Sequence, residues 1–225
     1  MAYILNIETS STTCSVALAS GMELISFSEI TRPFAHAESL NSLIRECLRS
    51  AEIDLLEVSA IAVSEGPGSY TGLRIGLSTC KGLCYSLGKP LIAINTLLVL
   101  ATPHEGKTHQ FICSSVDARR DDAYLAIFDN QLNTILPTQF FTIKEGELPT
   151  QLFESEIIFA GSGSNKIAKA LNRFDVTIHT ATPSAKNMIQ HSHKKYEVGD
   201  FEDLAYFEPA YHKKVHITTS KRRIV

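Results

Sequence analysis

The sequence has 225 residues, of which 44% are hydrophobic, and its 21 basic and 24 acidic side chains give a formal net charge of −3. This near balance excludes the strongly basic field of a protein that binds nucleic acid over its whole surface. The five cysteines include no C-x-x-C pair, which favours reduced thiols over disulfides. The chain has neither the pattern of an export signal nor a run of about 18 apolar residues, so we expect a cytoplasmic protein without a membrane partner.

Short polar turns divide the first 30 residues into apolar runs, which predicts a meander of three strands. We expect these strands at Tyr3 to Glu8, Cys14 to Ala19 and Glu23 to Glu29. From Phe34 to Ala51 the apolar residues recur every three or four positions, as on one face of a helix. A β-branched run at residues 60–63 then predicts a buried strand.

A glycine-rich corner, Gly66 to Gly76, follows this strand and reads GPGSYTGLRIG. The apolar spacing beyond it predicts a helix from Thr71 to Gly88. Two interpretations stay open, although the absence of a following Gly-Lys-Ser/Thr excludes a P-loop. In the first, free backbone N–H groups and the positive end of the helix dipole hold an anion. In the second, the glycines tighten the turn, and Gly72 and Gly76 leave a bare face against which another helix can lie.

The second half of the chain partly repeats the first. A short apolar run at Pro90 to Ile94 precedes a break at residues 102–107, where we place the domain boundary, dividing the chain into residues 1–103 and 104–225. The expected second copy of this β-β-β-α-β-α unit has strands at Phe111 to Val116, Ala123 to Phe128, Gln139 to Ile143 and Glu156 to Ala160, and helices at Glu147 to Phe153 and Ser164 to Phe174. Periodicity is weak beyond residue 181, where a closing helix or strand that returns to the first domain is reasonable.

The histidines do not predict a metal site. His191 and His193 are two residues apart and His212 and His216 are four apart, but neither pair has a third ligand at a recognised spacing. No nucleophile can be matched with a base from spacing either. We therefore expect neither a metal nor a catalytic residue.

The turn from Asp117 to Asp122 lies between two expected strands, where a phosphate-gripping loop would be placed in a nucleotide-binding fold. Its Arg119 and Arg120 are suited to a phosphate or a carboxylate. The turn has no glycine, however, and its aspartates repel anions. These features favour a surface turn whose charges pair with one another.

Four stretches together resemble one family: Ile7 to Ser10, the glycine corner, Val116 to Arg119 and Pro209 to Tyr211. They are similar to TsaB, formerly YeaZ, a family of bacterial tRNA threonylcarbamoyladenosine biosynthesis proteins. The corner is specific for that family, and the other stretches support it. The resemblance implies the α/β fold of actin, sugar kinases and the Hsp70 ATPase, of ribonuclease H-like type, which agrees with the duplicated unit.

The resemblance also implies partners. A TsaB-like chain acts beside TsaD, the related subunit that transfers threonylcarbamoyl to the N6 of the adenosine next to the anticodon in tRNA, and TsaE is the ATPase of the assembly. TsaD-like proteins carry an acidic pair, two metal-binding histidines and a Gly-Gly-His-Thr phosphate loop. Here those places read Thr12-Thr13, Thr96 with Leu100, and Asp117 to Arg120. We therefore expect a non-catalytic partner subunit without a cofactor of its own, and whether a nucleotide sits at the subunit interface stays open.

Surfaces of the two N-terminal helices are expected to pair with a TsaD homologue, or with a second copy when the protein is alone. The residues predicted for this interface are His36, Leu40, Leu43, Gly72, Arg74 and Gly76. The residues predicted to contact an anion or nucleotide are Gly66, Gly68, Ser69 and Arg119.

Two other functions compete with this interpretation. The first is a stand-alone enzyme of the same fold, either a glycoprotease-like peptidase or a small-molecule kinase or ATPase. The second is a tRNA-binding module that uses the basic tail with Lys221, Arg222 and Arg223. We expect that tail to be dispensable for association.

Overall fold

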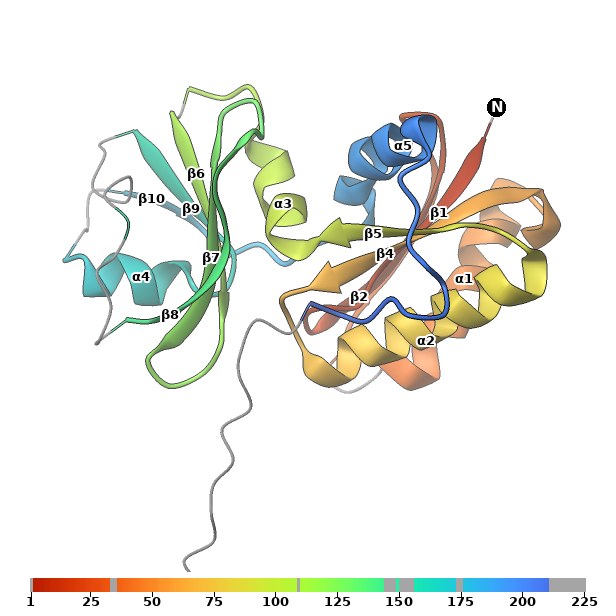
Figure 1. The fold of residues 1–225 in the computed structure, drawn as a ribbon, viewed down its shortest axis with the longest axis horizontal. Helices are drawn as coiled ribbons and strands as arrows, with labels where there is room; N and C mark the ends of the chain where they lie inside the picture. The colour runs from red at the N-terminus through yellow and green to blue at the C-terminus, as the bar shows by residue number, and fades with distance from the viewer. Residues whose placement is uncertain are drawn as a thin grey trace, which may run out of the picture.

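The computed structural model describes residues 2–32, 36–108, 110–143, 149, 156–172 and 176–210. In this part the chain forms two five-stranded sheets with helices packed on their faces (Figure 1). The first sheet contains β1 (Tyr3–Glu8), β2 (Thr13–Ser20), β3 (Glu23–Thr31), β4 (Val58–Gly66) and β5 (Leu91–Asn95). The second contains β6 (Phe111–Asp117), β7 (Asp122–Asp129), β8 (Thr134–Thr142), β9 (Ile157–Ala160) and β10 (Thr177–His179).

The helices are α1 (His36–Ala51), α2 (Tyr70–Leu87), α3 (Thr96–Ala101), α4 (Ser164–Ala170) and α5 (Ile189–Val198). Short 3-10 helices are η1 (Leu55–Glu57), η2 (Thr102–His104) and η4 (Ala185–Met188). The helix expected at residues 147–153 and the basic tail lie outside the described residues. None of the described helices is long and apolar enough to cross a membrane.

The two sheets have the same topology. The first has the order β3-β2-β1-β4-β5, and the second, taken from its β8 edge, has the equivalent order β8-β7-β6-β9-β10. In each, the first three strands are antiparallel neighbours, and the last two run parallel to the first strand. The predicted duplication is confirmed, and each copy carries a fifth strand beyond the expected pattern.

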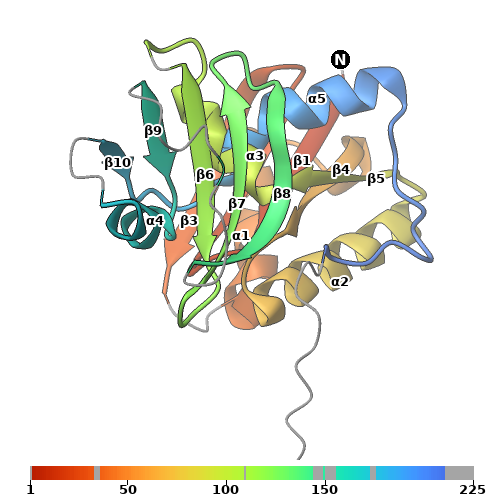
Figure 2. The same ribbon diagram turned by 60° about the vertical axis from the view of Figure 1, so that its left-hand side comes forward.

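Helices cover both faces of the first sheet. Because side chains alternate along a strand, Leu5 and Ile7 of β1 pack under α1 and α2, whereas Ile4 points to the opposite face. That opposite face is built largely from alanines, including Ala17 and Ala62, which let η4 and α5 approach closely. The segment from η4 to α5 thus returns to the first sheet, as Figure 2 also shows.

Helix α3 lies between the two sheets (Figure 1). Its Leu97 and Leu100 are buried with Ile112 and Phe128 of the second sheet. The division after residue 103 falls inside η2, just beyond this helix, and stays a prediction. On its other face, the second sheet is covered by α4, whose Ile167 joins a separate core cluster.

The segment after α5 crosses the outside of the first unit. The Glu202 N–H donates to the Leu91 carbonyl oxygen at 2.9 Å, and the Ala210 N–H donates to the Glu65 carbonyl oxygen at 2.9 Å. Between these two anchors, Leu204 and Phe207 pack against the α1 and α2 side of the core. The described chain therefore ends beside the glycine corner.

His191 ties α5 to the connection between the sheets. Its Nε2 lies 2.8 Å from the Thr102 hydroxyl, and burial, with Lys194 nearby, lowers the pKa of His191 to about 4.

As the pH falls, His191 becomes protonated in the unfolded chain before it does in the folded one. The free energy of unfolding should therefore fall by about 2 kcal/mol between pH 7 and pH 5 on account of His191. Glutamine stays neutral and keeps an N–H donor, so we expect His191→Gln to remove this loss of stability. Denaturant unfolding at pH 7 and pH 5 measures the free energy of unfolding of both proteins. An unchanged pH dependence in the variant would contradict the assignment.

Candidate functional site

The glycine corner between β4 and α2 packs against the turn that joins β1 to β2. The Ser69 N–H donates to the Ser10 carbonyl oxygen at 2.7 Å, and the Ser69 hydroxyl caps α2 by accepting the Gly72 N–H at 3.2 Å. The predicted contact of the Ser69 amide with an anion is therefore corrected, because this donor is used inside the subunit. Gly66 has a φ of +111° and lies against Ala210, so its side of the corner is also covered by the chain's own backbone.

The glycines of the corner are needed for close contact with this same turn. A Cβ atom at Gly68 would lie 2.4 Å from the Ser10 carbonyl oxygen. At Gly72 it would lie 2.1 Å from the Thr9 carbonyl oxygen, and at Gly76 2.2 Å from the Thr9 hydroxyl. The prediction that Gly72 and Gly76 form an open face for a neighbouring subunit is wrong, because both face Thr9 of their own chain.

Three interface predictions on α1 also need correction or refinement. Leu40 and Leu43 are buried in the core cluster beneath α1 and α2, so they stabilise the subunit itself. His36 begins α1 and is buried too, and its Nε2 has no hydrogen-bond partner in the described part of the chain. Of the six predicted interface residues, Arg74 is the exposed one.

A shallow hollow of about 420 Å³ opens between α1 and α2 on the outer side of the glycine corner. We call its lining the α1–α2 face, which consists of Ala37, Tyr70, Thr71, Arg74, Ile75, Ser78 and Thr79. The Arg74 guanidinium lies over the Tyr70 ring, 4.2 Å from its centroid, and Tyr70 is 55% exposed. Tyrosine and arginine are the residues enriched where proteins bind one another. Tyr70 was not predicted from the sequence, although an aromatic residue at the start of the expected helix was a usable signal.

The second unit repeats the closed corner. The Gly163 N–H, at the start of α4, donates to the Ser115 carbonyl oxygen at 3.2 Å, as Ser69 does to Ser10 in the first unit. An added Cβ at Gly161 would lie 2.3 Å from that same oxygen. In both units, therefore, the corner that could face a ligand is pressed onto the neighbouring hairpin.

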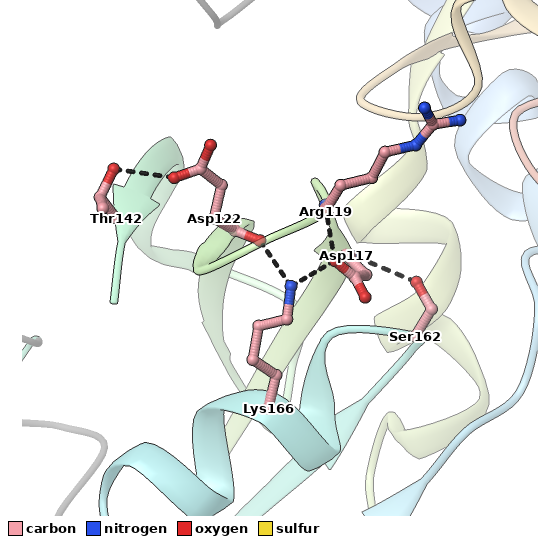
Figure 3. A network of polar contacts seen from close by, with 6 residues as sticks. All are labelled: Asp117, Arg119, Asp122, Thr142, Ser162 and Lys166. Carbon is pink, nitrogen blue, oxygen red and sulfur yellow. Dashed lines mark hydrogen bonds and ion pairs between the residues drawn. The ribbon is translucent and has the colours of Figure 1, made fainter. Parts of the chain in front are cut away.

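The turn from Asp117 to Asp122 is held by a lysine from α4. Figure 3 shows the Lys166 ammonium reaching the Asp117 carboxylate, and it donates to the Asp122 carbonyl oxygen at 3.0 Å. The turn was expected to pair its own charges, but Asp117 is paired instead with Lys166, which lies outside the turn on α4. The Arg119 N–H donates to Asp117, while its exposed side chain extends away from the network (Figure 3). Contact of Arg119, Gly66 and Gly68 with an anion stays a prediction.

The places that hold metal ligands in TsaD-like proteins are core positions here. Thr96 is fully buried at the start of α3, and Leu100 is buried against the second sheet. A hydroxyl and an isobutyl group do not make a transition-metal site. Among the described residues, no three His, Cys, Asp or Glu side chains gather so that they could hold a metal ion.

The duplicated sheets, with helices on both faces, give the chain the fold of the actin-like ATPase and sugar kinase class. The family model for TsaD, tRNA N6-adenosine threonylcarbamoyltransferase, matches residues 33–218. The chain therefore belongs to the TsaD family, and within it the relatives described next identify it as TsaB-like, the branch formerly called YeaZ. The predicted resemblance and fold class are confirmed.

TsaB of Escherichia coli is 30% identical over 135 residues, which are 59% of this chain and 57% of that protein. TsaB of Buchnera aphidicola is 30% identical over 69% of this chain and 66% of that protein. The match thus spans between half and two thirds of these curated relatives. Among solved structures, YeaZ from Pseudomonas aeruginosa superposes with a TM-score of 0.83 at 23% identity, covering 94% of this chain and all of that one.

Proposed function

We propose that the chain is a non-catalytic scaffold and activator in tRNA N6-threonylcarbamoyladenosine modification, and that it works in the cytoplasm by docking onto a TsaD homologue. A TsaE homologue completes the assembly, tRNA is the substrate of the complex, and the chain pairs with itself when alone. The names of the curated relatives support the pathway. The α1–α2 face carries the docking step, because it presents Tyr70 and Arg74 on the outer side of a firmly packed helix.

Arg74→Glu tests this proposal. A reversed charge in place of an arginine stacked on tyrosine should weaken binding to the TsaD homologue at least about 30-fold, or about 2 kcal/mol. Lys169→Glu, on the last turn of α4, makes the same charge change far from the face and should bind normally. Titration calorimetry with the purified partner measures both affinities.

The functional readout is threonylcarbamoyl transfer to tRNA, reconstituted with each subunit omitted in turn. We expect no transfer without this chain and reduced transfer with Arg74→Glu at limiting concentration. Transfer that proceeds equally well without the chain would exclude the activator role. Transfer or ATP hydrolysis by this chain alone would establish the stand-alone enzyme instead.

A further inference from the structure

Glu8, the last residue of β1, is a fully buried carboxyl group. One of its oxygens, Oε1, accepts the Ser10 N–H at 2.5 Å, while Oε2 has no hydrogen-bond partner among the described residues. Burial raises the pKa of Glu8, although the hydrogen bond from the Ser10 N–H opposes the shift. Burying such a group is costly, so its presence calls for a gain elsewhere.

We look for this compensating stabilisation in the Thr9–Ser10 turn, whose backbone Glu8 fixes by a hydrogen bond. The hydrogen bond from Ser10 closes the turn onto the Glu8 side chain, and the Thr9 N–H reaches the Ser64 hydroxyl of β4 at 3.4 Å. Two polar contacts, the shorter of them to Glu8, therefore hold the backbone of the turn from inside. Its outer side is the surface on which α2 begins.

Helix α2 rests on this turn through Gly72 and Gly76, which place no side chain of their own in the contact. The Ser10 carbonyl oxygen accepts the Ser69 N–H, and the Thr9 backbone and hydroxyl face the bare Cα atoms of Gly72 and Gly76. Atoms packed this closely cannot move independently, so the turn and the start of α2 must move together. A displacement of the turn must therefore displace the first two turns of α2, which carry Tyr70 and Arg74.

We propose that Glu8 is a positioning residue for the α1–α2 face: by fixing the Thr9–Ser10 turn it sets where α2 begins, and so where Tyr70 and Arg74 stand for a protein partner. The docking part of this inference rests on the function proposed above. The positioning part concerns the isolated chain and can be measured without a partner.

Glu8→Ala and Glu8→Gln separate positioning from general stability. Glutamine keeps the acceptor for the Ser10 N–H, whereas alanine removes it. Ile4→Ala, on the same face of β1 and equally buried, is the matched control that loosens the first unit without touching the turn. Amide hydrogen exchange is followed at Ser69 and Leu73, whose N–H groups donate to Ser10 and to the Ser69 carbonyl.

We expect Glu8→Ala to speed exchange at the Ser69 and Leu73 amides about tenfold more than at the amides of the first sheet. Ile4→Ala should speed exchange equally at these two amides and in the sheet. Glu8→Gln should stay near wild type. Affinity for the TsaD homologue should fall about tenfold in Glu8→Ala and recover in Glu8→Gln.

Uniform exchange in Glu8→Ala, or a glutamine variant that behaves like alanine, would overturn the positioning role. Selective exchange with unchanged affinity would overturn its link to docking. If the wild-type chain does not bind the TsaD homologue at all, the proposed function fails, and the exchange data still decide whether Glu8 positions α2.

Discussion

Gly72→Ala is expected to lower the free energy of unfolding by about 3 kcal/mol, because the new Cβ has no room. It would lie 2.1 Å from the Thr9 carbonyl oxygen, a backbone atom that cannot rotate aside as a side chain would. Either the helix or the turn must shift, and this shift strains the hydrogen bond that the Ser69 N–H donates to the Ser10 carbonyl oxygen. Urea denaturation followed by circular dichroism measures the loss.

Gly82→Ala is the control, since it lies in the same helix with no atom within 4 Å of the added Cβ. There, alanine should stabilise the protein by about 0.5 to 1 kcal/mol, because glycine is a poor helix former. Gly76→Leu, beside the Thr9 hydroxyl, should prevent folding altogether. A folded Gly76→Leu monomer that has lost only its ability to pair would restore the interface assignment that the structure corrects.

Most elements of the first unit follow from sequence patterns. The buried strands are apolar runs between polar turns, and the two long helices bury one face and expose the other. Helix α1 shows this well, since its buried residues, such as Leu40 and Ile44, are spaced along one stripe and its exposed face is charged. The strand β4 was expected at residues 60–63 and extends over Val58–Gly66, because polar Ser64 and Glu65 continue the sheet beyond the apolar run.

Helix α3 was not predicted and α5 was expected only as a closing helix or strand, for opposite reasons. Helix α3 is apolar nearly throughout, since it lies between two sheets and has little exposed face to create a period. Helix α5 shows a weak pattern because its buried side includes the polar residues His191 and Ser192. An apolar period of three to four residues arises only when a helix has one apolar and one polar face. Neither of these helices has two such different faces.

The position of the glycine corner was predicted from the sequence, but the neighbour that it packs against was not. The glycine corner was recognised as a feature that permits close approach, yet the sequence cannot say which neighbour approaches. That neighbour is Thr9, which the chain brings to Gly72 only through the parallel pairing of β1 with β4. Lys166 was missed for the same reason, because its contact with Asp117 joins distant parts of the chain.

Among the glycine-to-alanine changes, the largest loss of stability is expected from Gly161→Ala in the second unit, about 4 kcal/mol. Two costs add there. Gly161 has a φ of +98°, which side chains rarely adopt, and an added Cβ would lie 2.3 Å from the Ser115 carbonyl oxygen and 2.8 Å from Leu100. Because Leu100 belongs to α3, the clash would also loosen the helix that lies between the two sheets.

Gly199→Ala separates the two costs, since Gly199 has a φ of +70° and no atom within 4 Å of an added Cβ. It should cost about 1 to 2 kcal/mol, the penalty for a left-handed backbone alone. The difference between the two variants in denaturant unfolding then measures the contact of the β9–α4 corner with Ser115 and Leu100. If the two variants lose equal stability, that contact is loose, and the second corner has room for a ligand where the first, packed against Thr9 and Ser10, does not.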